Sequence, residues 1–330
     1  MAGPLDKVLQ MARKYGNVET GQETLEAERA EASETGASAA TEVQKVELAV
    51  PALPAEMKVW PESVRGVPNV ALRSALFAGI KAGDERLHLA ARHIHSQADI
   101  KITYTGGQLD QGDLDVWETV LHLSREQNMA GCLTNSYQML KALDLTDTGV
   151  NRERLGQRLS RLNATALKIS VQMQGKTFSY EGSLIDDVTD VDHADGGRSR
   201  DYRITLNPKL LVLFGRDQYT LIDWKIRREL AKHPLAQWVH GYYSSHAAPL
   251  PVSVELLHRM SGSGAGTVTK FNQTLRKALD AVEIACEKHG QPFAYELKKG
   301  LLTVVKTPSA AQARYLARAA AKAAKEKTIP

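Results

Sequence analysis

The side chains best suited to chemistry crowd one predicted helix in the last third of the chain. Residues 264–288 place a polar mixture opposite apolar residues at helical spacing. In the DNA major groove, Asn and Gln pair with adenine, Arg pairs with guanine, and Thr contacts the thymine methyl group. This mixture is more typical of base reading than of a plain cationic patch; the alternative is an ordinary amphipathic helix. The candidate DNA-binding residues here are Thr267, Thr269, Lys270, Asn272, Gln273, Arg276 and Lys277.

A second predicted helix, residues 150–165, carries a row of arginines. Arg154, Arg158 and Arg161 share one face at spacings i, i+4 and i+7. Arginine suits both bidentate contact with guanine and contact with phosphate. The alternative is that these arginines pair with Glu153 and nearby acids on a solvated face. The candidate DNA-binding residues here are Asn151, Arg152, Arg154, Arg158 and Arg161.

Two further basic features are candidates for phosphate contact. Residues 291–306 predict two strands around Lys298-Lys299-Gly300, so Lys298 and Lys299 occupy the tip of a hairpin. Residues 308–330 predict a basic, Ala-rich helix, for which the alternative is a solvated helix of high intrinsic propensity.

The sequence offers little support for catalysis. His93-Ile94-His95 has the His-x-His spacing of metal-dependent nicking nucleases, but no acidic ligand is obviously placed for it, and two surface histidines are the alternative. The run from Gly262 to Gly266 precedes a helix and does not fit the G-x-x-x-x-G-K-[ST] phosphate loop. No Ser-His-Asp, H-E-x-x-H or paired-carboxylate motif is found. We therefore expect a protein that is not an enzyme and that uses no cofactor and no metal.

The elements that must position these residues occur in the same order twice. In the first half we expect a strand, three helices and three strands, over 100–106, 114–126, 135–143, 150–165, 166–172, 178–185 and 200–207. In the second half we expect a strand, helices and the hairpin, over 219–223, 224–230, 235–246, 252–262, 264–288 and 291–306. Helix, turn, helix and hairpin is the winged-helix arrangement, whose second helix enters the major groove. The predicted fold class is α+β, with two tandem winged-helix domains.

Apolar spacing also predicts which side of each helix faces a core. Thr134 is the predicted N-cap of the helix over 135–143. The residues predicted to face inward on the two candidate DNA-binding helices are Val150, Leu155, Leu159 and Leu162, and Val268, Phe271, Leu275, Leu279 and Val282.

Length and composition bound the class of protein. The chain has 330 residues, which suggests two domains, and its apolar content of 43% is enough to build cores. Cys132 and Cys286 lie far apart, so we expect neither a disulfide framework nor a Cys-based zinc site. No stretch approaches the ~20 apolar residues that cross a bilayer, and the N-terminus lacks a signal core, so we expect a cytoplasmic protein without a membrane partner.

Charge is distributed unevenly along the chain. Residues 1–58 hold 6 basic and 10 acidic residues, whereas the remainder holds 36 basic and 28 acidic residues. A basic body suggests a polyanionic partner, although a solvated basic surface is the alternative. Residues 17–58 are too poor in aromatic and large apolar residues to fold alone. We expect a disordered acidic tail over 1–58, winged-helix domains over 59–208 and 209–307, and a basic helix over 308–330.

Several sequence blocks together resemble one family. The chain is similar to TrfA-type replication initiators of broad-host-range plasmids, in order from about Trp60 to Glu287. RSALF together with KITYTG is the most specific part of this resemblance. The blocks are WPESVRGVPNVALRSALF, DIKITYTG, SRLNATALKIS, YRITLNPKLLVLF, YTLIDWKIRREL, YYSSH and LHRMSGS.

The resemblance implies a function and partners. It implies two winged-helix domains that bind repeated double-stranded origin sequences (iterons). It also implies that the protein helps to open an AT-rich segment, where single-stranded DNA is a further partner, and that it loads the host helicase. It also implies the host DnaA and DnaB proteins as partners, active monomers, and dimers that restrain copy number. The family's sliding-clamp patch, a Gln-Leu-Ser-Leu-Phe-like segment, would precede Trp60, where this chain reads PALPAEMKV; this departure argues against clamp contact.

We therefore predict a plasmid replication initiator that binds iterons, promotes origin opening and recruits the replicative helicase. One alternative is a plasmid-encoded winged-helix transcriptional repressor built on the same scaffold. A second alternative is a metal-dependent nicking nuclease that uses His93 and His95.

A chain that begins at Val59 is expected to bind origin DNA about as well as the full chain, because residues 1–58 are acidic and poor in aromatic residues. Titration of labelled origin DNA with both proteins measures this. A tenfold loss of affinity, about 1.4 kcal/mol, would show instead that the tail belongs to the binding unit.

Overall fold

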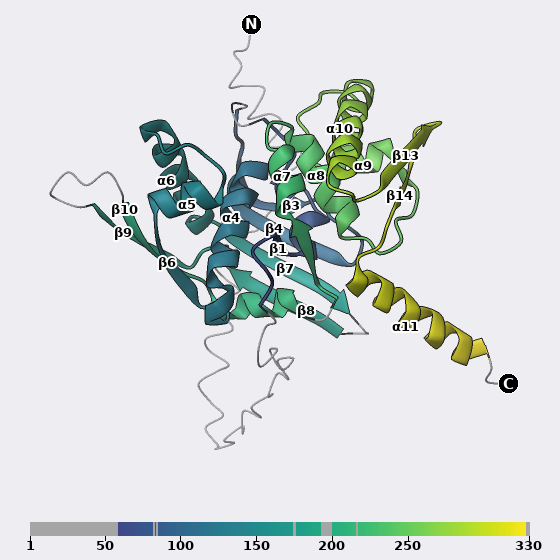
Figure 1. The fold of residues 1–330 in the computed structure, drawn as a ribbon, viewed down its shortest axis with the longest axis horizontal. Helices are drawn as coiled ribbons and strands as arrows, with labels where there is room; N and C mark the ends of the chain where they lie inside the picture. The colour runs from purple at the N-terminus through teal and green to yellow at the C-terminus, as the bar shows by residue number, and fades with distance from the viewer. Residues whose placement is uncertain are drawn as a thin grey trace, which may run out of the picture. The chain divides into compact units, whose positions relative to one another are not determined.

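The computed structural model describes residues 59–81, 83, 85–173, 176–192, 200–215 and 217–327 (Figure 1). The tail predicted over 1–58 lies outside the described residues. Among those described, no helix is both long and apolar enough to cross a membrane. The architecture is mixed α+β.

A four-stranded antiparallel sheet lies in the first half of the chain (Figure 1). Its strands follow the order β3-β4-β7-β8, so residues far apart in sequence become neighbours. In β4, side chains alternate between buried and more exposed positions, because successive residues of a strand point to opposite faces. The strands are β3 (His88–Ile94), β4 (Ile100–Gly107), β7 (Ala166–Met173) and β8 (Lys176–Gly182).

Helix α4 (Gln111–Ser124) starts at a capping box. The Asp110 carboxylate accepts a hydrogen bond from the backbone N–H of Asp113, and the Asp113 carboxylate accepts one from that of Asp110. The helix is buried along most of its length. Trp117 lies at its centre, stacks on Phe77 at 5.7 Å and donates a hydrogen bond to the carbonyl of Leu184.

One order of elements occurs twice. In the first half, helix, strand and two helices are followed later by two strands: α4, β6 (Gly131–Asn135), α5 (Ser136–Ala142), α6 (Gly149–Asn163), β9 (Asp187–Asp192) and β10 (Arg200–Thr205). The second half has α8 (Pro234–Ser244), β12 (Val252–Ser253), α9 (Val254–Met260), α10 (Val268–Lys288), β13 (Phe293–Lys298) and β14 (Leu301–Lys306). The two small sheets have matching orders, β6-β10-β9 and β12-β14-β13.

Short elements connect these parts. Strand β1 (Val64–Pro68) pairs antiparallel with β11 (Tyr219–Asp223), and β2 (Phe77–Ala78) pairs parallel with β5 (Leu109–Asp110). The remaining elements are α3 (Asn69–Leu72), the 3₁₀ segments η1 (Arg125–Gln127) and η2 (Pro208–Phe214), α7 (Trp224–Glu229) and α11 (Ala310–Lys327).

Two apolar cores fill the described part of the chain. The first extends from Trp60 to Ile222, and the second extends from Ile226 to Val304. The β1–β11 pair therefore carries the first core past residue 208, where we expected the first domain to end. The division into domains at 208 and 209 stays a prediction, and residues 50–330 belong to one compact unit.

The structure corrects several local expectations. Asn135, rather than Thr134, caps α5, and Thr134 lies in β6. Val150 and Val268 are 57% and 38% exposed, because each lies in the first turn of its helix, beyond the edge of the core.

The strands predicted over 166–172 and 178–185 form β7 and β8. They join the four-stranded sheet instead of the small sheet beside α5 and α6. β10, predicted over 200–207, pairs with β9, which the sequence did not predict. The segment 193–199 between them lies outside the described residues.

Replacing Leu159 by Ala is expected to lower the free energy of unfolding by about 2–5 kcal/mol, because this side chain is 1% exposed and its loss leaves a cavity. Urea denaturation measures the change. Val150→Ala, in the first turn of the same helix, is the matched control, and its effect should stay within about 0.5 kcal/mol. Equal effects would show that α6 does not pack through Leu159.

Candidate nucleic-acid interface

Helix α10 presents a broad polar face to solvent. Phe271, Leu275 and Leu279 are fully buried and hold the opposite face on the second core. Thr267 caps the helix by accepting a hydrogen bond from the backbone N–H of Lys270. The exposed residues of the predicted set are Thr267, Thr269, Lys270, Gln273, Arg276 and Lys277, while Asn272 is half-buried.

Within the part of the chain that the structure describes, the basic side chains of this face carry no ion-pair partner that would compete with a ligand. Among the described residues, no carboxylate lies within ion-pair distance of Lys270, Arg276 or Lys277. Asn272 leaves its amide oxygen unpaired. The helix N-terminus adds the positive end of its dipole close to Lys270. The face can therefore donate several hydrogen bonds to an anion or to base edges.

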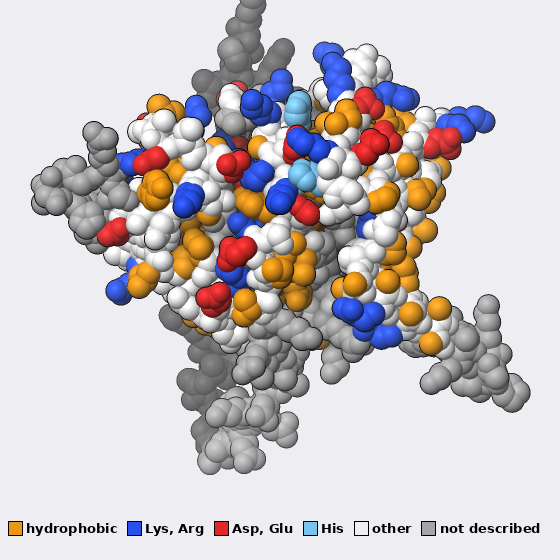
Figure 2. Space-filling model, in the orientation of Figure 1, with side chains coloured by type: hydrophobic (Ala, Val, Ile, Leu, Met, Phe, Trp, Pro, Cys, Tyr) orange, Lys and Arg blue, Asp and Glu red, His pale blue; other side chains and the backbone are white. Residues whose placement is uncertain are grey.

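The β13–β14 hairpin belongs to the same small sheet as β12 and ends in a basic tip. Its turn needs Lys299 and Gly300 at positive φ, 49° and 76°, which is why glycine occupies the second position. Lys298 pairs with Glu296, whereas the side chain of Lys299 extends from the turn into solvent. Figure 2 shows basic side chains, in blue, at this tip, with an acidic one beside them.

Helix α6, the other predicted DNA-binding helix, is built differently. Leu155, Leu159 and Leu162 are buried, and Thr148 caps the first turn. Arg154 is exposed, with no carboxylate within ion-pair distance among the described residues. Of the arginines predicted on this helix, Arg154 is therefore the one that is free to meet a ligand.

Arg158 and Arg161 point back at the start of α4. The Nη1 atom of Arg158 lies 2.7 Å from Asp110 Oδ1 and 3.0 Å from Asp113 Oδ1. Arg161 Nη2 lies 3.0 Å from Asp113 Oδ1, and Arg86 Nη1 lies 3.1 Å from Asp113 Oδ2. These side chains are mostly buried, so the cluster holds α6 against α4. DNA contact by Arg158 and Arg161 stays a prediction. In the structure, both guanidinium groups already bind the carboxylates at the start of α4.

The remaining predicted residues of α6 are also engaged. Arg152 makes a bidentate contact with Asp147, at 2.6 and 2.5 Å. Asn151 donates from Nδ2 to the carbonyl of Thr146 at 2.8 Å. Both contacts fix the turn before α6 and are close enough to solvent to exchange for a ligand.

The carboxylates that pair with these arginines were not predicted from the sequence. Asp110-x-x-Asp113 has the spacing of a capping box, which would have placed both residues at a helix start. Their exposed fractions of 2% and 0% could not be read from that spacing. The cluster of three arginines around two buried carboxylates forms only in the tertiary structure, because its members are far apart in the sequence.

A second buried charge cluster joins α4 to α7. Arg227, which is 0% exposed, places Nε 2.8 Å from Asp115 Oδ1 and 3.0 Å from Glu118 Oε2. Arg228 Nη1 lies 2.9 Å from Asp115 Oδ2. Burial raises the pKa of Glu118 to about 8, while the charge of Arg227 opposes that shift. The pair of clusters makes α4 the element to which both halves of the chain are attached.

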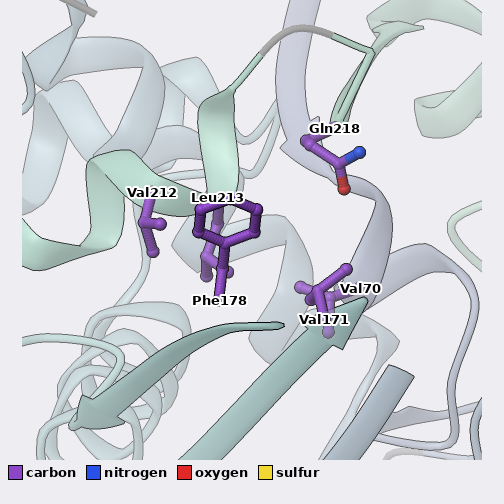
Figure 3. Close-up of a pocket in the computed structure, with 6 residues that line it drawn as sticks. All are labelled: Val70, Val171, Phe178, Val212, Leu213 and Gln218. Carbon is purple, nitrogen blue, oxygen red and sulfur yellow. The ribbon is translucent and has the colours of Figure 1, made fainter. Parts of the chain in front are cut away.

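The two histidines considered as metal ligands, His93 and His95, lie at the surface of the protein. His93 lies in β3 beside Thr103, and His95 follows the end of that strand; both are exposed. Within the described ranges, no group of three His, Cys, Asp or Glu side chains could hold a metal ion. A pocket lined by Val70, Phe178 and Leu213 has about 10 Å³, enough for roughly one water molecule (Figure 3).

Comparisons with known proteins agree with one another. The family model described as "TrfA protein" matches residues 18–288. The plasmid replication initiator protein TrfA of Escherichia coli is 30% identical over 224 residues, which are 67% of this chain and 57% of that protein. The matched region therefore spans little more than half of the relative's length.

Two solved structures are also similar. A crystal structure of domains 2 and 3 of RctB, in a selenomethionine form, matches with a TM-score of 0.47 and 12% identity over 70% of this chain and 95% of that one. A second crystal structure of RctB domains 2–3 gives a TM-score of 0.45 and 12% identity over 72% and 96%.

The described residues form a mixed α+β protein in which one order of elements occurs twice, with a basic helix in each copy. The extent of the family match is decisive, because it covers most of the chain. The chain belongs to the TrfA family.

Removing the Asp113 carboxylate by Asp113→Ala is expected to lower the free energy of unfolding by about 3–5 kcal/mol, because Arg86, Arg158 and Arg161 lose a buried counter-charge. Denaturant unfolding monitored by circular dichroism measures this loss. Asp147→Ala removes the partner of Arg152 nearer the surface and should cost about 1 kcal/mol or less. Similar losses in both variants would contradict a structural role for the Asp113 cluster.

Proposed function

We propose that this protein initiates plasmid replication by binding iterons through two tandem winged-helix units. The observation that carries the proposal is the exposed face of α10, where Lys270, Gln273 and Arg276 lie together without ion-pair partners among the described residues. Such a face can present donors to base edges and to phosphates at the same time.

The two units are α4 to β10 and α8 to β14. In each unit the second helix of a helix–turn–helix pair, α6 or α10, is the recognition helix. The hairpins β9–β10 and β13–β14 are the wings. The matching strand orders β6-β10-β9 and β12-β14-β13 support this assignment, since each wing pairs with the strand that precedes its helix pair.

The two recognition helices make different numbers of contacts with DNA. Helix α10 supplies most of the base contacts, because its polar residues are free. Helix α6 supplies Arg154, Arg152 and Asn151, while Arg158 and Arg161 keep it in place. Lys298 and Lys299 in the second wing hold phosphates.

The remaining steps follow from the family. Binding bends or strains the origin so that its AT-rich segment opens, and the protein recruits the host helicase DnaB with the help of DnaA. Monomers bind the origin, and self-association limits copy number. The protein acts in the cytoplasm by positioning other components and catalyses no reaction itself.

Variants of α10 test the proposal. Gln273→Ala and Arg276→Ala are each expected to cost roughly 1–3 kcal/mol on the cognate repeat and to relax preference at one base pair. Lys270→Ala should weaken binding to all sequences alike and lower the salt slope by about one unit, because it removes a phosphate contact. Titration on cognate and scrambled repeats at several salt concentrations separates the two outcomes.

Lys209→Ala is the matched control, because Lys209 is exposed and lies outside both helices and wings. All these variants should keep the unfolding free energy of the parent, since no buried apolar group is lost. If Gln273→Ala and Arg276→Ala left affinity and base preference untouched, α10 would not be the reader, and α6 with Arg154 would become the first candidate.

A further inference from the structure

A cavity of about 340 Å³ lies where the β1–β11 pair meets the second half of the chain. Val64 and Leu221 form the wall on the strand side, and Phe293 lines it from the start of β13. The opposite side comes from α8, the end of β14 and the first turn of α11. The volume is within the range of sites for small organic ligands. Cys286 near the end of α10 also lines the cavity, but none of the side chains proposed to contact DNA does.

Lys306 brings a positive charge to this cavity and has no carboxylate within ion-pair distance among the described residues. Its Nζ atom donates to the amide oxygen Oε1 of Gln312 at 2.9 Å, and no ion pair to it occurs among the described residues. Burial lowers the pKa of Lys306 to about 8, which reflects the cost of keeping an ammonium group away from water. An anion in the cavity would remove that cost.

His240 adds an unsatisfied polar group to the same lining. Its side chain is 4% exposed, and Nδ1 has no hydrogen-bond partner. Burial lowers the pKa of His240 to about 3, with Arg227 and Lys306 adding to the shift, so the imidazole is neutral near pH 7. A neutral imidazole carries one N–H donor and one acceptor. Because Nδ1 is closed to water, a hydrogen bond from the ring to a molecule in the cavity would have to be made by Nε2.

The other polar groups around the cavity are compatible with an anion. Asp223 is its carboxylate, and it is already occupied: Oδ1 accepts from the backbone N–H groups of Lys225 and Ile226, and Oδ2 accepts from Gln291 Nε2 at 2.9 Å. Ser244, Thr307 and Ser309 contribute hydroxyl groups. The cavity therefore combines one cation that has no ion-pair partner, one carboxylate whose oxygens already accept hydrogen bonds, and several hydroxyl groups.

We propose that this cavity binds a small organic phosphate or carboxylate, with Lys306 as the counter-charge and His240 as a hydrogen-bond partner. The apolar wall of Val64, Leu221 and Phe293 contacts the organic part of the ligand, because a bare inorganic anion would leave most of the volume empty. Since the walls come from both cores, a bound ligand links the β1–β11 pair to the second half of the chain.

Thermal unfolding of the full chain with added phenyl phosphate, benzoate or neutral benzyl alcohol tests the proposal. Millimolar phenyl phosphate or benzoate is expected to raise the Tm, whereas benzyl alcohol and an equal ionic strength of sodium chloride should not, because a ligand of the native state stabilises it. The two anions distinguish a phosphate site from a carboxylate site. Lys306→Gln should weaken the affinity for the better anion by at least about tenfold, since a charge-assisted hydrogen bond is lost.

Lys209→Gln removes an exposed lysine outside the cavity and should leave the affinity unchanged. Nitrogen resonances of the His240 ring in the ¹⁵N-labelled parent protein give a second measurement that needs no variant to fold, and they should shift on addition of the anion. The proposal fails if neither anion raises the Tm or shifts these resonances. It also fails if Lys306→Gln and Lys209→Gln bind the anion as the parent does.

Discussion

The structure depends on the burial of carboxylates along helix α4. Asp113 and Asp115 are 0% and 6% exposed, and an unpaired carboxylate at such depth would be strongly destabilising. Arginines from other elements compensate them: Arg158 and Arg161 from α6 bind Asp113, and Arg227 from α7 binds Asp115. Because removal of either partner leaves an uncompensated buried charge, these contacts restrict where α6 and α7 can lie. Helix α4 therefore sets the position of one candidate recognition helix and of the connection to the second half.

This constraint explains why two helices of similar composition differ in what they offer a ligand. Helix α6 is attached through its arginines as well as its leucines, so part of its positive charge is internal to the protein. Helix α10 is held mainly by buried apolar side chains such as Phe271, Leu275 and Leu279, and Lys270, Arg276 and Lys277 remain in solvent. The ion pair between Lys288 and Glu229 lies at the far end of the helix. Arginines at helical spacing do not by themselves indicate a DNA contact, because carboxylates on a neighbouring element can bind them. The indication is stronger where the structure places no carboxylate opposite them.

The two halves share an order of elements within different surroundings. In the first half, β7 and β8 intervene between α6 and β9 and extend a sheet that begins with β3 and β4. In the second half, α10 leads directly to β13 through a short turn at Gly290. The second unit is consequently smaller, and its hairpin has a described, tightly turned tip at Lys299 and Gly300.

Much of this protein could be predicted from local pattern. The 3.6-residue spacing of apolar residues predicted α4, α6 and α10, alternation predicted β4, and Lys298-Lys299-Gly300 predicted the hairpin turn, because these patterns depend on neighbours along the chain. Family membership was likewise predicted from short blocks of sequence and is confirmed. Partners distant in sequence were decided by tertiary structure alone: the joining of β7 to β4, the exposure of Val150, and the pairing of Arg158 with Asp110 across 48 positions. The spacing of residues in the sequence indicates which side chains share one face of a helix or strand. The residues that pack against that face come from distant segments of the chain, so their charge and size depend on the tertiary structure.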